Sequence, residues 1–441
     1  MNIKNKIMIF CVSVLLGVML FIISSHIITL LSNKGIISKN IEMVFSYKTN
    51  DEILREDVIK IDWSKEYPFT VENRDLNTND THSVYDKIEK QIKKVRNKIE
   101  EESKKVPKRY YVAELANRYN KFIGWDIVPQ SEYASLRELE PGYYSGLSEK
   151  HDITSQAKAY VEFIKYCKEL NISVFYVQAL GKISKTQDSV TNKEDFSNYN
   201  ADQFLNYISN CGGDYLDLRE NAAALNINYH DLFYKTDHHW TAETGLWASR
   251  IIIDNLNKKY NCNLDEKILS SYNFKKDVYY SWFLGSQGKK VTLSNAAPDD
   301  FSLIYPVFKT RFHYQIPTKD IDCYGDFSIM YDMRQISKKD LYELSPYQTY
   351  NYSDLAITHI HNILNTNDKK ILIIKDSFGN TVAPFISLCF EYTDVIDLRH
   401  FNGSLHSYIQ INKPDYIIVI YNTFQYKDKI ELNHHDLFDF R

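Results

Sequence analysis

The segment Ile371-Leu372-Ile373-Ile374-Lys375-Asp376-Ser377-Phe378-Gly379-Asn380 decides the fold of this 441-residue chain. Four consecutive apolar residues indicate a strand that is buried on both sheet faces, and small residues then allow a tight turn into a helix. In open α/β sheets, ligands bind outside the carboxyl ends of the strands, where Ser377 stands. Because serine at this position also caps helices, the spacing alone leaves both a helix cap and a nucleophile open.

The same pattern repeats on both sides of this segment. Strands are expected at residues 172–178, 214–218, 370–374, 394–398 and 415–420, and helices at 153–170, 201–209, 242–260, 379–390 and 404–411. Strands that alternate with helices of this length predict a parallel sheet with helices on both faces. Residues 268–350 interrupt the alternation with many aromatic residues and no long helix, so we expect an insertion or lid beside the active site.

A second motif, Tyr234-Lys235-Thr236-Asp237-His238-His239-Trp240-Thr241, precedes the helix expected at 242–260. A carboxylate, a histidine and a serine are the three parts of an activated serine nucleophile. Since His238 and His239 are adjacent, they point in different directions, and only one of them can serve as the base. The motif therefore makes a catalytic site the leading hypothesis.

Together the two motifs resemble the DHHW proteins, relatives of the periplasmic alginate O-acetyltransferases. The resemblance runs from about residue 110 to the C-terminus, and residues 236–241 and 375–378 carry it. It implies an SGNH-hydrolase-like (flavodoxin-like) α/β fold with a permuted order of catalytic blocks. It also implies acyl transfer or ester hydrolysis on an exported polysaccharide.

The resemblance assigns a role to each residue of the triad. Ser377 would be the nucleophile, His239 the base and Asp237 the acid that orients the base. Trp240 would pack behind the imidazole, and His238 would either support the triad from outside it or lie on the acceptor side.

Two residues at strand ends are weaker candidates for the same site. Asn422 follows strand 415–420, where SGNH proteins commonly place an asparagine in the oxyanion hole, although the usual Gly-x-Asn pattern is absent. Arg399 follows strand 394–398 and would bind the acceptor or the oxyanion. A strand-end turn for Asn422 and a surface ion pair for Arg399 remain open.

The N-terminal region has the pattern of a membrane anchor. Lys4 and Lys6 precede an apolar run over residues 7–31, long enough to cross a bilayer. We expect a signal anchor at 1–33, a stalk with an amphipathic helix at 34–108, and an SGNH-like domain at 109–441. The protein would then be single-pass in the cell membrane with its catalytic domain outside the cytoplasm. A cleaved signal peptide is the alternative.

Composition excludes several classes of protein. The chain has 53 basic and 57 acidic residues and a net charge of −4, which argues against nucleic-acid binding. None of its six cysteines has the C-x-x-C spacing of a zinc site. Buried free thiols are expected, with a single bridge between Cys211 and Cys262 left open.

The resemblance, together with the expected membrane anchor, implies a membrane-anchored O-acyltransferase, most simply an O-acetyltransferase, that needs no metal or bound cofactor. The resemblance implies a polysaccharide acceptor and a multispanning membrane O-acyltransferase partner that supplies the acyl group. A glycan O-acetyl esterase and a non-catalytic glycan-binding scaffold are the alternatives. A manganese phosphoesterase of the Asp-His-His type fits poorly, because no aspartate follows closely after His239.

Overall fold

The computed structural model describes residue 114 and residues 136–186, 195–225, 227–430 and 436–441. The chain divides into two compact units, Met1–Val95 and Arg96–Arg441, and every described residue belongs to the second. The predicted anchor at 1–33 and stalk at 34–108 lie outside the described residues. Within those residues, no helix combines the length and apolarity that crossing a membrane requires.

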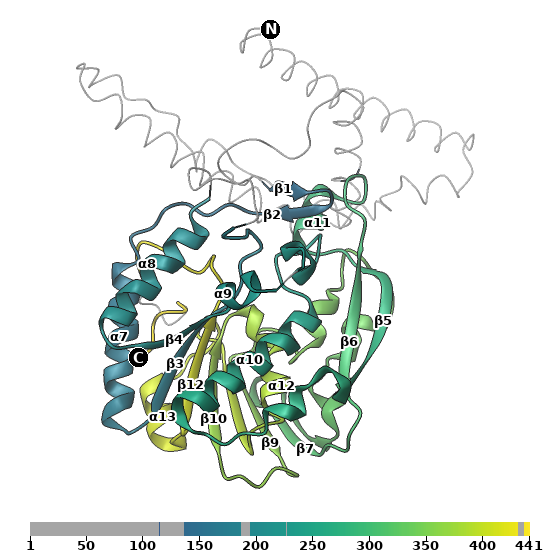
Figure 1. Ribbon diagram of the computed structural model, residues 1–441. Coiled ribbons are helices and arrows are strands. Elements are labelled where there is room, and N and C mark those ends of the chain that lie inside the picture. The colour runs from purple at the N-terminus through teal and green to yellow at the C-terminus, as the bar shows by residue number, and fades with distance from the viewer. Residues whose placement is uncertain (1–113, 115–135, 187–194, 226, 431–435) are drawn as a thin grey trace, which may run out of the picture. The chain divides into compact units, whose positions relative to one another are not determined.

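An eight-stranded mixed sheet is the centre of the described unit (Figure 1). In spatial order its strands are β4 (Asp214–Asp217), β3 (Ser173–Gln178), β12 (Tyr416–Tyr421), β10 (Lys370–Lys375), β11 (Tyr392–Ile396), β9 (Ile357–Asn362), β7 (Phe312–Ile316) and β8 (Ile321–Gly325). The first five strands are parallel to one another, whereas β9, β7 and β8 join through antiparallel pairings. The predicted parallel sheet is therefore correct for one half of the sheet and wrong for the other.

The parallel half has a permuted flavodoxin-like order. When counting starts at β10 and continues through β11, β12, β3 and β4, the spatial order reads 2-1-3-4-5. The order reverses between β10 and β12, and ligands bind at such a switch point. Ser377 follows β10 and Asn422 follows β12, so both stand at this position.

Helices cover both faces of the parallel half, as predicted. Ile371 and Ile373 of β10 point into a core shared with α9 (Leu218–Ala223), α10 (Ala242–Tyr260) and α12 (Ala383–Ile386). Leu372 and Ile374 point into the opposite core, with α7 (Thr154–Glu169), α8 (Ser197–Asn210) and α13 (Leu405–Asn412). Alternate residues of one apolar strand thus serve two cores, which explains its unbroken hydrophobicity.

The segment expected as an insertion at 268–350 is partly built into the sheet. Its first half forms a separate antiparallel pair, β5 (Phe274–Phe283) and β6 (Asp299–Pro306), with α11 (Ser286–Val291) between them. Its second half supplies β7 and β8 of the main sheet. A further antiparallel pair, β1 (Arg137–Glu140) and β2 (Tyr143–Ser145), precedes α7.

Two local predictions need correction. The helix expected at 379–390 is instead a 3₁₀ helix, Ser377–Thr381, followed by the short α12. All five cysteines within the described residues are free, so Cys211 and Cys262 form no bridge. Cys167, Cys262 and Cys389 are buried, as expected for thiols that serve packing.

Candidate active site

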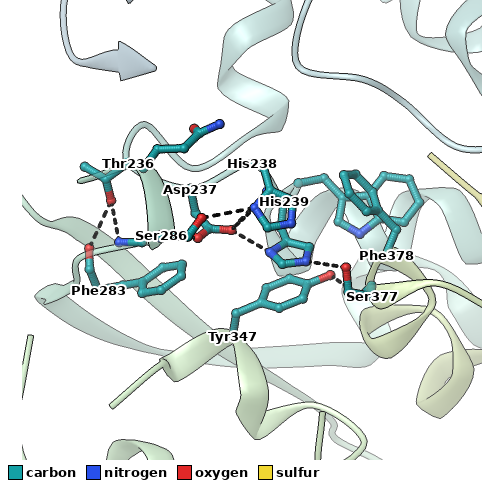
Figure 2. A network of polar contacts seen from close by, with 12 residues as sticks. Thr236, Asp237, His238, His239, Phe283, Ser286, Tyr347, Ser377 and Phe378 are labelled. Atoms are coloured by element: carbon teal, nitrogen blue, oxygen red, sulfur yellow. Dashed lines mark hydrogen bonds and ion pairs between the residues drawn. The ribbon is translucent and has the colours of Figure 1, made fainter. Parts of the chain in front are cut away.

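A continuous chain of hydrogen bonds joins the three residues of the predicted triad (Figure 2). The Ser377 Oγ lies 2.6 Å from His239 Nε2, and His239 Nδ1 lies 2.5 Å from Asp237 Oδ1. Because a carboxylate only accepts, His239 carries its proton on Nδ1 and presents the lone pair of Nε2 to the serine hydroxyl. This arrangement can take a proton from Ser377.

The contacts of Asp376 show which residue caps the helix that follows β10, a role that the sequence left open for Ser377. Its side chain caps the 3₁₀ helix by accepting from the Phe378 N–H at 2.9 Å, and its backbone carbonyl accepts from the Gly379 N–H. The capping role therefore belongs to Asp376, and the Ser377 hydroxyl is left for His239. The Phe378 and Gly379 N–H groups are thus engaged by Asp376, whereas the Ser377 N–H donates to no described residue and could face an oxyanion.

The acid and the base lie on a tight loop before α10. The Tyr234 N–H donates to the His239 carbonyl at 3.2 Å and closes the loop, and Thr241 then caps α10 by accepting from the Thr244 N–H. Asp299, the first residue of β6, accepts from the Lys235 and Thr236 N–H groups at 2.6 and 2.8 Å. The loop is thus fixed by strands that are remote in sequence.

Gly285 allows α11 to approach Asp237, the predicted acid. A Cβ at this position would lie 2.2 Å from Asp237 Cβ and 2.5 Å from the Thr236 carbonyl oxygen. The close approach lets the Ser286 N–H donate to Asp237 Oδ2 at 2.7 Å. Both oxygens of the Asp237 carboxylate are therefore hydrogen-bonded.

The charge on Asp237 is well stabilised. Burial opposes its ionisation, but His238, His239 and the hydrogen bonds from His239 and Ser286 outweigh burial and hold the pKa of Asp237 well below its usual range. The acid therefore stays ionised across the neutral range and can stabilise an imidazolium on His239.

Lys182, which follows β3, binds the same loop through hydrogen bonds to its backbone carbonyl groups. Its buried ammonium donates to the carbonyl oxygens of Lys235 and Asp237, each at 2.7 Å, and to Gln287 Oε1 at 3.2 Å. Burial, partly offset by Asp299 and Asp237, lowers the pKa of Lys182 to about 7.

Comparison with known proteins fits this geometry. The family model described as DHHW protein matches residues 224–396, which include Asp237, His239 and Ser377. The match covers 173 of the 441 residues and shows a likeness to that family over this span. The resemblance expected from the two motifs is confirmed, over a shorter span than residues 110–441.

Solved structures support the fold of the described unit. Bacillus cereus PatB1 is 17% identical with a TM-score of 0.55, and the match covers 70% of this chain and 100% of that chain. A DHHW family protein from Eubacterium siraeum is 17% identical with a TM-score of 0.52, covering 67% and 93%. The O-acetyltransferase domain of Pseudomonas putida AlgJ matches at 12% identity, 65% and 90% coverage, and a TM-score of 0.35, too low to support an inference. No curated protein matches the sequence.

Asn422 does not occupy the place expected for an oxyanion donor. Its backbone N–H and its side-chain Nδ2 both donate to Asp376 Oδ2, at 2.8 and 2.7 Å, and its Oδ1 accepts from the Phe424 N–H. Burial of Asp376 raises the pKa of that carboxyl group, and these donors oppose the rise. Asn422 thus links the end of β12 to the residue before the nucleophile.

Arg399 belongs to an internal ion cluster rather than to a lone surface pair. Its guanidinium binds Asp397 through two hydrogen bonds, at 2.9 and 2.6 Å, and contacts Asp354 at 3.1 Å. Lys375, fully buried, binds Asp354 and Asp397 as well. These contacts engage Nε and one terminal nitrogen of the guanidinium, and acceptor binding by Arg399 stays a prediction.

The aromatic ring that stacks on the His239 imidazole is Tyr347, which sequence reasoning missed. Its ring lies 3.9 Å from that of His239, nearly parallel at 14°, and its hydroxyl donates to the Ser377 carbonyl at 3.0 Å (Figure 2). Trp240, expected in this role, instead packs edge-on against Phe378 and donates to Thr381 Oγ1. Tyr347 stands in a 3₁₀ helix, Pro346–Thr349, in a segment with no catalytic pattern of its own.

Two groups of side chains in the described residues could in principle hold a metal ion. In the first, Asp237, His238 and His239, the Asp237 and His239 atoms that would bind are engaged in the hydrogen bonds given above. In the second, Asp354, Asp397 and His400, the carboxylates already bind Lys375 and Arg399. Either group would have to give up these contacts to bind a metal.

Proposed function

We propose that this chain is an O-acyltransferase, most simply an O-acetyltransferase, that modifies a polysaccharide through an acyl-enzyme on Ser377. The observation that carries the proposal is the hydrogen-bonded chain from Ser377 Oγ through His239 to Asp237. The DHHW match over the same residues and the site's place at the switch point support it. An intact triad also makes a purely non-catalytic scaffold the poorer reading.

The geometry supports a two-step reaction. Ser377 Oγ attacks the acyl carbonyl carbon of a donor ester while His239 Nε2 takes the serine proton. The bond to the donor oxygen breaks, and that oxygen receives the proton from His239. A sugar hydroxyl then attacks the acyl-serine ester, gives its proton to His239, and leaves the acyl group on the sugar as Ser377 Oγ regains a proton.

The setting of the reaction is part of the proposal. The apolar run at 7–31 would anchor the chain, with the catalytic unit outside the cytoplasm. An acyl donor made in the cytoplasm would then need a multispanning membrane O-acyltransferase to deliver the acyl group. With water in place of the sugar hydroxyl, the same triad would be a glycan O-acetyl esterase.

Covalent labelling tests the nucleophile. The full chain should react once with an aryl sulfonyl fluoride and should release phenol from an activated phenyl acetate, with the adduct located on Ser377 by peptide mass spectrometry. Ser377→Ala should lose the label and reduce turnover about 10⁴-fold or more, because members of a triad act as a unit. Ser407→Ala, an exposed serine on α13, is the matched control. Undiminished turnover by Ser377→Ala would end the proposal.

A second measurement separates transferase from esterase. Glycan oligomers incubated with the enzyme and a donor ester should gain acetyl groups, as seen by mass spectrometry, faster than acetate accumulates. Release of acetate alone, together with consumption of acetylated glycans, would establish the esterase instead.

A further inference from the structure

His238 is the solvent-facing member of the Asp-His-His motif. Its side chain is 43% exposed, compared with 11% for His239 and 5% for Asp237. Its ring centroid lies 3.8 Å from that of His239 and 6.3 Å from that of Phe378, the residue after the nucleophile (Figure 2). A molecule that reaches the acyl group on Ser377 from solvent therefore arrives beside two imidazoles.

Two neighbours favour one tautomer of His238. Its Nδ1 lies 3.2 Å from Ser286 Oγ, a hydroxyl that can donate or accept, and 3.5 Å from Asp237 Oδ1. The negative charge of the nearby carboxylate favours a proton on Nδ1, which leaves the lone pair on Nε2. Among the described residues Nε2 has no hydrogen-bond partner, so it can accept a hydrogen bond from a ligand.

The charge state agrees with this role. The buried part of the ring, followed by repulsion from His239, lowers the pKa of His238, so the ring is neutral near pH 7 although its outer edge reaches solvent. A neutral imidazole accepts a hydroxyl proton in a hydrogen bond and adds no repulsion to the imidazolium that forms on His239 during the reaction.

We propose that His238, held by Ser286, binds the hydroxyl next to the one that reacts, so that the acceptor is a vicinal diol of a sugar ring. The inference rests on the proposed function. The reacting hydroxyl gives its proton to His239, and the neighbouring hydroxyl donates a hydrogen bond to His238 Nε2. Two adjacent imidazoles thereby select two adjacent hydroxyls. No bond changes at His238, which acts as a positioning residue for the acceptor.

The test measures how the acyl-enzyme divides between an alcohol and water. The full chain is acylated with an activated phenyl acetate in the presence of trans-1,2-cyclohexanediol or cyclohexanol, and acetylated alcohol and free acetate are both quantified. The wild type should favour the diol over the mono-alcohol. His238→Phe, which keeps a ring but lacks the nitrogen, should reduce that preference about three- to tenfold, as expected for one lost hydrogen bond. His238→Gln, whose amide oxygen accepts, should restore part of it.

Ser286→Ala is the second variant, since it removes the hydroxyl that holds His238 but keeps the backbone N–H on Asp237. It should lower the diol preference in the same direction and by less. A preference that is absent in the wild type, or unchanged in His238→Phe of wild-type melting temperature, overturns this inference while acylation of Ser377 stands. Failure of the wild type to form any acyl-enzyme overturns the proposed function, and this inference with it.

Discussion

Tyr347 joins the base and the nucleophile of the site through a single side chain. Its ring stacks on His239, and its hydroxyl holds the Ser377 carbonyl. The residue is buried, and burial raises its pKa well above the usual value, so the phenol stays neutral and donates. The two contacts differ in kind, because one depends on the ring and the other on the hydroxyl.

Two substitutions at Tyr347 separate these contacts. Tyr347→Phe keeps the stacked ring and should lower kcat for an activated phenyl acetate about three- to tenfold, the effect of one lost hydrogen bond. Tyr347→Leu also removes the stack and should lower kcat by about a further tenfold with little change in KM, because the base is no longer held in line with Ser377. Steady-state kinetics of both variants check this. Equal kcat values for the two would show that the ring contributes nothing.

Several elements that are remote in sequence meet at the loop of residues 235–237, which carries Asp237. Lys182 follows β3, and Asp299 begins β6. Gly285 directly precedes α11, and Ser286 is its first residue. Each of these residues contacts residues 235–237. The loop closes on itself through the Phe233–Trp240 bridge, and the Tyr144 N–H of β2 donates to the Lys235 carbonyl at 3.0 Å, so its shape depends on these neighbours. The segment from β5 to β6 thus stabilises the loop through Asp299 and Ser286.

Substitution of Gly285 tests this support. Gly285→Ala would force its methyl group into Asp237 and the Thr236 carbonyl, and separation of the two segments should cost about 1–3 kcal/mol of unfolding free energy. Activity should fall at least tenfold, because the acid moves with the loop. Gly146→Ala, where an added Cβ meets nothing within 4 Å, is the matched control and should change neither quantity appreciably. Urea unfolding and esterase assays of both variants give the answer; equal behaviour of the two contradicts the argument.

At the scale of the whole molecule, the candidate site combines the carboxyl end of the parallel strands with the segment that lies between α10 and β9 in the chain. The parallel half supplies Ser377 at the switch point, and the residues between α10 and β9 supply Ser286 and Tyr347. A pocket of about 790 Å³ opens at the opposite end of the sheet, near the starts of β3 and β12, and contains none of these residues. The sheet topology, and not the volume of this pocket, therefore indicates the position of the candidate site.

The buried charge of Lys182 couples global stability to pH. Its folded pKa of about 7 lies below the value of about 10.4 in an unfolded chain, so between these values the unfolded state binds the extra proton. The free energy of unfolding of the wild type, relative to Lys182→Met, should therefore rise as pH increases from 7 to 9, by about 1–2 kcal/mol. Urea unfolding at several pH values measures the difference. Lys258→Met, at an exposed lysine of α10, should show almost no such trend. A flat or falling difference for Lys182→Met contradicts the expected sign.

The sequence by itself determined the parallel half of the fold and predicted the three residues that the structure joins by hydrogen bonds. Continuous apolar runs mark strands such as β10 and β12 because both of their faces are buried, and Asp237, His239 and Ser377 stand at element ends that local pattern reveals. Strand β9 escaped notice because Ile357–Asn362 buries alternate residues only, a pattern with no long apolar run. Only the tertiary structure brought Tyr347, Ser286 and Lys182 to the loop, tied Asn422 to Asp376, and placed Arg399 in an ion cluster. The physical reason is that periodicity records which residues are buried, whereas the partners of a buried polar group depend on strand order and register, which chain-distant contacts fix.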